Sequence, residues 1–425
     1  MKILVVYPYL PWPLDRGTYH RTFHLLKELA SAHDVSLVAL AENGEGAEHA
    51  GVFARFCRSV EIISFQHPPW AKLFPQRLLD PLPSNVAHWN APAVAARLHE
   101  IMRNGGFDAI HVCDIVMAQY FLRSRLPLII DRSRVDLQFQ LAEHSRMNFS
   151  RRARLLRYEG YTKLWLFERR LARRAALEIV CGQDDETFLR RWVKKDLPIE
   201  VLVNGVDLEY FAHYPAAGCA VRPSVIFCGA MDYNPNIDAL RWYFSEMHEP
   251  LRRAIPDLEF FVVGKNPTPE ILAHAQRPGV TVTGSVADVR PYYRRAWLQL
   301  VPLRIGGGTR LKIVESLAIG TPVISTTIGA QGLALEHNRE ILLADTTEAF
   351  VRETTRALRD AALRQQLEDA GRDVAQQRFS WERIGRRLRE IYEARVGSIQ
   401  VRGNEHAPAI RPPSLSLDPS GAGRR

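Results

Sequence analysis

The chain has 425 residues, of which 46% are hydrophobic and 24% charged, and its formal net charge is +9 at pH 7. This length favours two or three domains, and this composition excludes a disordered or fibrous chain. The positive charge favours acidic partners such as phosphates, nucleic acid or anionic lipid, although a solubilising surface charge explains it equally well.

The cysteine content and the apolar runs indicate in which cellular compartment the protein is expected. The five cysteines are widely spaced and form no C-x-x-C pair, which argues against a disulfide framework or a zinc site and fits a reducing compartment. The apolar start of the chain is short and interrupted by prolines, which indicates a first strand rather than a signal peptide. No run of about 18 apolar residues occurs, so no membrane-spanning helix is predicted. We therefore expect a cytoplasmic protein.

The first half of the chain alternates short apolar runs with segments of helical spacing. Strands are predicted at 3–7, 35–40, 60–65, 109–112, 128–131, 177–181 and 199–203. Helical spacing follows the first strand at 18–30, and a long basic helix or helix pair is predicted at 151–175. Asp184 or Asp185 is expected to cap a helix that runs through Trp192. This order of elements predicts a parallel α/β sheet.

A second series of the same kind begins after a weakly structured linker near residue 215. Its predicted strands are 224–228, 258–263, 280–283, 297–301, 322–326 and 341–343. Its predicted helices are 236–244, 268–276, 289–295, 309–319 and 347–359. We therefore predict two domains, 1–215 and 216–380, followed by an amphipathic helix within 381–397 and a disordered tail at 398–425.

The strongest chemical signal lies between Val301 and Glu315, where a buried strand leads through three glycines into a helix. Gly306, Gly307 and Gly308 allow a ligand to approach the backbone closely. The helix start beyond them offers free N–H groups and a partial positive charge, which together suit an anion.

Side chains at this helix start extend the pattern. After Thr309, the cations Arg310 and Lys312 suit an anion with more than one charge, such as a diphosphate. Glu315 is placed to accept hydrogen bonds from the hydroxyls of a ribose. The alternative is a tight turn with solvated basic residues, because glycine-rich turns are common.

Glu315 is followed by a short apolar helix, Gly320, Pro322 and an apolar strand. With this segment the chain resembles the nucleotide-sugar glycosyltransferases of family 4, which have the GT-B architecture. Further segments resemble the family in matching order: Gly17, Val203–Asp207, Phe227–Gly229, Val262–Gly264 and Val282–Val286. More narrowly, Met231–Asn236 with the glycine-rich run resembles a subgroup linked to bacterial exopolysaccharide assembly. The resemblance implies two Rossmann-like domains that face a cleft, and a last helix that returns to the N-terminal domain.

The resemblance also implies a set of site residues and a donor substrate. A nucleotide diphosphate sugar is the donor, and the resemblance implies no further cofactor. The donor-binding residues that it implies are Gly17, Gly229, Gly284, Val286, Gly306, Gly307, Gly308, Thr309, Arg310, Lys312 and Glu315. The residues expected to act in catalysis are Asp131, His111, Arg310 and Lys312. Fixed cations at the diphosphate stabilise the charge that grows on the departing group.

Some positions depart from the family pattern. The first Glu of the frequent E-x7-E motif is replaced by Gly307, and Asn234–Asn236 stands where many members have a basic residue. Asp131 replaces a frequent His and is expected to act as an acid or base or to position the acceptor, although a loop Asp explains it as well. His111 is expected to face the cleft, and the alternative is a structural His at a strand end.

The charged segments bear on three other kinds of partner, which are a metal ion, an anionic membrane and nucleic acid. No D-x-D pair occurs and the acidic run Asp184–Glu186 lies at a predicted helix start, so we expect no metal. The basic region 146–174 interleaves cations with aromatic and leucine side chains. It is expected either to lie on an anionic membrane, which would place the protein on the inner face of the cytoplasmic membrane, or to be a packed helix with a wet basic face. Nucleic acid is not expected, because no nucleic-acid-binding motif accompanies the charge.

The resemblance implies a retaining glycosyltransferase, and we expect one of the hexosyltransferase type, which acts on a glycan or lipid-linked acceptor in exopolysaccharide biosynthesis. A nucleotide-sugar epimerase on the same fold is one alternative. A non-catalytic nucleotide-sugar-binding subunit is another, because the first Glu is missing. No G-x-G-x-x-G follows the first strand, which argues against a dehydrogenase.

Overall fold

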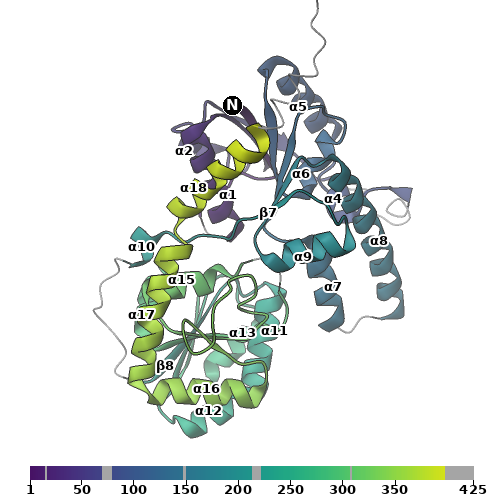
Figure 1. Cartoon of the computed structure of the whole chain (residues 1–425). Coiled ribbons are helices and arrows are strands. Elements are labelled where there is room, and N and C mark those ends of the chain that lie inside the picture. The colour runs from purple at the N-terminus through teal and green to yellow at the C-terminus, as the bar shows by residue number, and fades with distance from the viewer. Residues whose placement is uncertain (15–16, 69–78, 147–149, 213–221, 307–308, 398–425) are drawn as a thin grey trace, which may run out of the picture.

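The computed structural model describes residues 1–14, 17–68, 79–146, 150–212, 222–306 and 309–397. They form two α/β domains stacked one above the other (Figure 1). The predicted strands are confirmed in both domains, and so is the expected fold class of two Rossmann-like domains. The predicted tail at 398–425 lies outside the described residues, as does the predicted linker near 215.

The N-terminal sheet has seven parallel strands in the order β3-β2-β1-β4-β5-β6-β7. They are β1 (Lys2–Tyr7), β2 (Asp34–Glu42), β3 (Ser59–Phe65), β4 (Ala109–Cys113), β5 (Leu128–Asp131), β6 (Leu177–Val180) and β7 (Ile199–Val201). In the register of the central strands, Val5 lies opposite both Leu37 and His111. The apolar run of β1 is buried because helices cover both faces of a parallel sheet.

The helices of this domain include several that the apolar pattern did not indicate. They are α1 (Gly17–Ala32), α2 (Ala50–Phe53), α4 (Ser84–Ala87), α5 (Pro92–Gly105), α6 (Ile115–Ala118), α7 (Asp136–Arg146), α8 (Arg151–Arg174), α9 (Gln183–Trp192) and α10 (Leu208–Ala212). The basic segment forms one continuous helix, α8. The expected cap of α9 was wrong, because Gly182 occupies the N-cap position while Asp184 and Asp185 lie in the first turn.

The C-terminal sheet is also parallel, with the order β10-β9-β8-β11-β12-β13. Its strands are β8 (Ser224–Cys228), β9 (Glu259–Val263), β10 (Val280–Gly284), β11 (Leu298–Val301), β12 (Val323–Ser325) and β13 (Leu342–Leu343). Its helices are α11 (Asn234–Trp242), α12 (His248–Ala254), α13 (Pro269–Ala273), α14 (Arg290–Arg295), α15 (Leu311–Ile319), α16 (Thr347–Arg359) and α17 (Ala361–Arg378). Helix α15 begins two residues later than predicted. In both sheets the strand order reverses beside the first strand, and ligands of such folds bind at the carboxyl ends there.

The last helix, α18 (Trp381–Ile391), leaves the C-terminal domain and lies along α1 of the N-terminal domain (Figure 1). Its first residue, Trp381, stacks on His24 with ring centroids 4.7 Å apart. Further along, Arg389 forms an ion pair with Glu28 of α1. Beyond the helix, Tyr392 is buried in the N-terminal domain. These contacts attach α18 and the residue after it to the N-terminal domain.

Candidate active site

The start of helix α15 lies at the carboxyl end of β11 and turns toward the N-terminal domain. Arg310 is the N-cap residue, and its side chain makes no capping hydrogen bond. The guanidinium folds back over Gly306, so that any Cβ there would collide with it. Burial lowers the pKa of Arg310, while Tyr233 and Asp185 oppose the shift. Arg310 Nη2 also donates to the carbonyl of Ile328 in its own domain at 3.5 Å, while Asp185 belongs to α9 of the N-terminal domain.

Lys312 follows Arg310 by two residues and lies beside the end of β8. Its Nζ donates a hydrogen bond to Asn236 Oδ1 at 2.8 Å and lies 4.3 Å from the centroid of the Phe227 ring. A Cβ at Gly229 would come within 2.9 Å of this Nζ, which explains the need for glycine there. Burial lowers the pKa of Lys312 to about 8. Neither a neutral amide nor an aromatic ring cancels the charge of an ammonium group. The charge that Lys312 carries below its pKa can therefore act on an incoming anion.

Glu315 occupies the next turn of the same helix. The hydroxyl of Tyr293 donates to its Oε2 at 3.3 Å and is itself approached by Gln299 Nε2 at 3.3 Å. Burial raises the pKa of Glu315 to about 7, against the effects of Tyr293 and Lys312. The carboxylate is therefore fixed in orientation about one turn from the two cations.

Glycines bring the neighbouring strand ends close together. A Cβ at Gly264, after β9, would collide with the carbonyl oxygen of Gly229. The N–H of Gly264 donates to the carbonyl of Gly284 at 3.2 Å, and Gly284 has a φ of 69°. Val286 follows, partly buried against the core of this domain. Gly229 and Gly284, two of the residues predicted to bind the donor, thus both lie against Gly264.

The N-terminal domain meets this region through the first turn of α1. Gly17 begins the helix, and a Cβ there would lie 3.1 Å from Leu311 Cδ1. Thr309 also reaches across, because its hydroxyl donates to the carbonyl of Cys181 at 3.2 Å. The structure therefore brings Gly17 together with Thr309 and the two cations that follow it. Gly307 and Gly308 lie outside the described residues.

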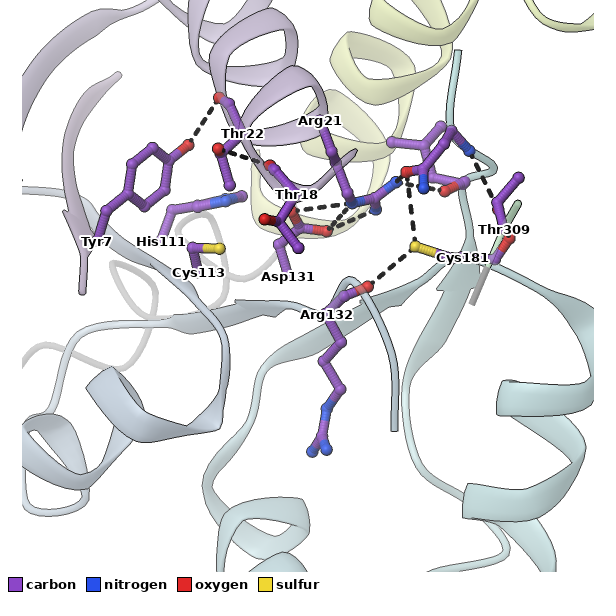
Figure 2. Close-up of polar contacts among 12 residues, drawn as sticks. Tyr7, Thr18, Arg21, Thr22, His111, Cys113, Asp131, Arg132, Cys181 and Thr309 are labelled. Carbon is purple, nitrogen blue, oxygen red and sulfur yellow. Dashed lines mark hydrogen bonds and ion pairs between the residues drawn. The ribbon is translucent and has the colours of Figure 1, made fainter. Parts of the chain in front are cut away.

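Asp131 and His111 lie deeper in the N-terminal domain than expected (Figure 2). Asp131 is 1% exposed and accepts from Arg21 Nη2 at 2.6 Å. His111 is fully buried, its Nδ1 lies 2.6 Å from the hydroxyl of Tyr392, and burial lowers its pKa to about 4. Neither side chain reaches solvent, so both environments favour the structural alternative that the sequence left open for each residue.

Several residues that shape the site were not predicted to do so from the sequence. Arg21 and Asn204 support the N-terminal side, while Asn236 and Tyr293 hold Lys312 and Glu315. Arg21 lies within an apolar helical stretch, where a fully buried cation demands a partner, and this is a weak signal. The others became recognisable only through contacts with distant segments.

Two parallel-sheet α/β domains that meet at the start of α15 form the architecture of a GT-B glycosyltransferase. Comparison with known families agrees: residues 17–210 match the family described as Glycosyltransferase Family 4, and residues 222–360 match Glycosyl transferases group 1. Together these matches cover well over half of the chain. The chain belongs to the family 4 glycosyltransferases, and the resemblance inferred from its motifs is confirmed.

Solved structures share the fold over nearly the whole chain. Sucrose-phosphate synthase from Thermosynechococcus elongatus is 20% identical with a TM-score of 0.69, and the match covers 94% of this chain and 100% of that one. HepE of Anabaena, in complex with UDP-glucose, is 18% identical with a TM-score of 0.64, over 93% and 100% of the two chains. WaaG, a glycosyltransferase involved in lipopolysaccharide biosynthesis, is 15% identical with a TM-score of 0.60, over 91% and 98%.

A curated relative shares only part of its length with this chain. An uncharacterised 44.6 kDa protein in the cps region of Klebsiella pneumoniae is 23% identical over 137 residues. The match spans 30% of this chain and 35% of the relative, so about a third of that protein is covered.

Proposed function

We propose that this glycosyltransferase moves a hexose from a nucleotide diphosphate sugar to a glycan or lipid-linked acceptor, with retention of anomeric configuration, in exopolysaccharide biosynthesis. The observation that carries the proposal is the Lys312 ammonium, held 2.8 Å from Asn236 Oδ1 beside the start of α15. HepE, which shares the fold, was crystallised with UDP-glucose. The relative from a cps region supports the exopolysaccharide role.

The chemistry follows from where charge grows during transfer. Breaking the bond between sugar and diphosphate leaves negative charge on the leaving group. Arg310, Lys312 and the N–H groups at the start of α15 are fixed at that end of the cleft and stabilise this charge more in the transition state than before it. Glu315 accepts hydrogen bonds from the ribose and sets the register of the donor. We propose that these cations perform the neutralisation without a metal; among the described residues, no cluster of His, Cys, Asp and Glu is arranged to hold one.

The long basic helix supports a lipid-linked acceptor. On α8, Leu155, Tyr158 and Leu166 are 72%, 56% and 54% exposed. Their spacings of three and eight residues place them on one side of the helix, among its arginines. Large apolar side chains beside cations are typical of surfaces that lie on anionic lipid. None of the described helices has the length and hydropathy to cross a bilayer. We therefore propose peripheral binding to the inner face of the cytoplasmic membrane.

The membrane proposal is tested by sedimentation with vesicles of phosphatidylglycerol and phosphatidylcholine. A Leu155→Ser, Leu166→Ser double variant is expected to lose most of the binding of the wild type. Leu272→Ser is the matched control, because Leu272 is 48% exposed on the other domain. Equal sedimentation of the double variant and the wild type would contradict this role for α8.

The enzymatic proposal is tested by incubating the protein with a panel of UDP- and GDP-sugars and with lipid-linked or glycan acceptors. We expect acceptor-dependent release of nucleoside diphosphate with at least one donor, and loss of most of that release in Arg310→Ala. Interconversion of a donor without acceptor would favour an epimerase instead. Donor binding without turnover under every acceptor would favour a non-catalytic subunit.

A further inference from the structure

We propose that Thr309 latches the N-terminal domain onto the start of α15, and that Arg21 is a positioning residue that fixes the N-terminal half of this latch. The inference rests on the proposed function, because the latched segment carries the donor-binding cations Arg310 and Lys312. It assigns to Thr309 a role between the domains in place of direct donor contact.

The Thr309 hydroxyl has protein partners on the opposite domain (Figure 2). It donates to the carbonyl oxygen of Cys181 at 3.2 Å, and the backbone N–H of Asn204 points to it at the longer distance of 3.5 Å. One hydroxyl provides one donor and two acceptor positions, so both contacts form together. The hydroxyl therefore joins the chain after β6 and the chain after β7 to the residue preceding Arg310.

The partner segment after β7 is held directly by one buried cation, and the segment after β6 is joined to it through Asn204. Arg21 Nη1 donates to the carbonyl of Leu202 at 2.8 Å and to Asn204 Oδ1 at 2.9 Å. The other side of the guanidinium pairs with Asp131, and both side chains are at most 1% exposed. Cys181 joins the same cluster, since its thiol lies 3.6 Å from Asn204 Oδ1. A planar guanidinium with five donors satisfies all these acceptors in one fixed geometry, which a lysine does not reproduce.

Close backbone approaches flank the latch on both sides. Gly17 lies one turn before Arg21 on α1, and a Cβ there would lie 3.1 Å from Leu311 Cδ1. On the other side, a Cβ at Gly182 would lie 3.3 Å from the Cα of Gly332 in the C-terminal domain. The domains thus approach each other on both sides of Thr309, whose hydroxyl supplies one of the hydrogen bonds between them, as does Asn234 Nδ2 with Glu143 Oε1 at 3.0 Å.

In the proposed reaction, the latch controls how the two domains close over the donor. While the latch holds, the start of α15 faces the N-terminal domain, where the acceptor is proposed to bind, and water is kept from the donor. When the hydroxyl is removed, the domains separate more readily and the donor is held less tightly. A rival role, in which the hydroxyl binds the donor phosphate directly, weakens donor binding without changing the domain separation.

The test compares Thr309→Val, which keeps the side-chain volume, with Thr309→Ser, which keeps the hydroxyl. Small-angle X-ray scattering without donor reports the separation of the domains and needs no activity. We expect a larger radius of gyration and a donor dissociation constant raised about three- to ten-fold for Thr309→Val, the size of one hydrogen bond. Thr309→Ser is expected to match the wild type. Thr355→Val on α16 is the control, because within the described part of the chain the Thr355 hydroxyl has no hydrogen-bond partner.

Arg21→Lys tests the second half of the proposal through a double-mutant cycle with Thr309→Val. If both residues act through the same latch, the two effects on donor affinity add up to more than the effect of the double variant. Unchanged scattering with weakened donor binding in Thr309→Val would overturn the latch in favour of direct phosphate contact, and unchanged scattering and affinity would overturn both. Failure of the wild type to bind any nucleotide sugar would instead overturn the proposed function. If Arg21→Lys does not fold, the Thr309 pair decides alone.

Discussion

Two groups of buried charges in this protein are built in opposite ways. In the N-terminal domain, Arg132 pairs with Glu168 and with Glu178, each at 2.8 Å, and all three side chains are at most 1% exposed. At the donor end, Lys312 meets a neutral amide and an aromatic ring, and Glu315 meets a phenol. In the first group, the charges of the protein pair with one another. We propose that a ligand satisfies the cation and the carboxylate of the second group.

The partners of a buried charge distinguish structural residues from site residues more clearly than burial alone does. The buried guanidiniums of the N-terminal domain are matched by carboxylates, as the cost of burying a charge requires. Burial moves the pKa of Lys312 down to about 8 and that of Glu315 up to about 7, and it raises the pKa of Glu178 in the N-terminal group to about 7 as well. Groups shifted toward neutrality beside a cleft are typical of functional sites.

The largest expected effect breaks the scaffold side of the comparison. Arg132→Met leaves Glu168 and Glu178 buried without their cation, and we expect a loss of about 3–5 kcal/mol in the free energy of unfolding. Urea unfolding followed by circular dichroism measures it. The matched control is Arg241→Met, whose ion pair with Glu270 is 60% and 42% exposed, with an expected loss below about 1 kcal/mol. Equal losses in the two variants would remove the distinction.

Lys312→Gln tests the site side. We expect kcat/KM for the donor to fall roughly 10²- to 10³-fold, because a cation fixed at the leaving diphosphate is lost. The melting temperature should not fall, since burial already disfavours the charged ammonium. The control is Arg304→Gln, which lies between β11 and α15. Arg304 already forms an ion pair with Asp238, with Nη2 2.6 Å from Oδ1. A similar loss of kcat/KM in both variants would mean that general charge, rather than the position of Lys312, matters.

The pH dependence sharpens the comparison. Below the Glu315 pKa of about 7 the carboxyl is protonated and accepts ribose hydrogen bonds poorly. Above the Lys312 pKa of about 8 the amine loses its charge. We therefore expect kcat/KM for the donor to be highest between about pH 7 and 8, falling up to ten-fold per pH unit outside this range. In Asn236→Asp, the new carboxylate stabilises the ammonium, so the alkaline limb should move to higher pH. An alkaline limb that stays in place would show that another group controls it.

The smallest effect concerns Glu178. Burial raises its pKa to about 7, so the folded state holds a proton that the unfolded state releases between its ordinary pKa and that value. Its contribution to stability is therefore present at low pH and lost as the pH rises through about 7. Glu178→Gln lacks this titration, and its melting temperature should approach or exceed that of the wild type as the pH rises. Parallel melting curves for the two proteins from pH 5 to 8 would contradict the assignment.

Local pattern was enough for the fold and for the donor-binding segment. The strands were predictable because strands of a parallel sheet are buried on both faces and read as continuous apolar runs. The start of α15 was predictable because glycines, cations and a carboxylate follow one another within a few residues. Helix α17 was not expected, since most of its side chains are polar and few of them are buried.

The environments of individual side chains could not be predicted, because they depend on contacts across the chain. Asp131 looked like a strand-end acid, but its partner Arg21 lies 110 positions away. Asn236 looked like the loss of a basic residue, yet it orients Lys312 from 76 positions away. Spacing along the sequence carries no information about such pairs.

The most direct measurement is calorimetric titration of UDP and of GDP into the wild type, Arg310→Ala and the control Arg304→Gln. If the start of α15 seats the donor diphosphate, at least one nucleotide binds the wild type and Arg304→Gln with similar affinity. Binding to Arg310→Ala should then be weaker by about ten-fold or more, the effect of a lost charge-assisted hydrogen bond. Equal affinities of Arg310→Ala and the wild type would show that the diphosphate is bound elsewhere.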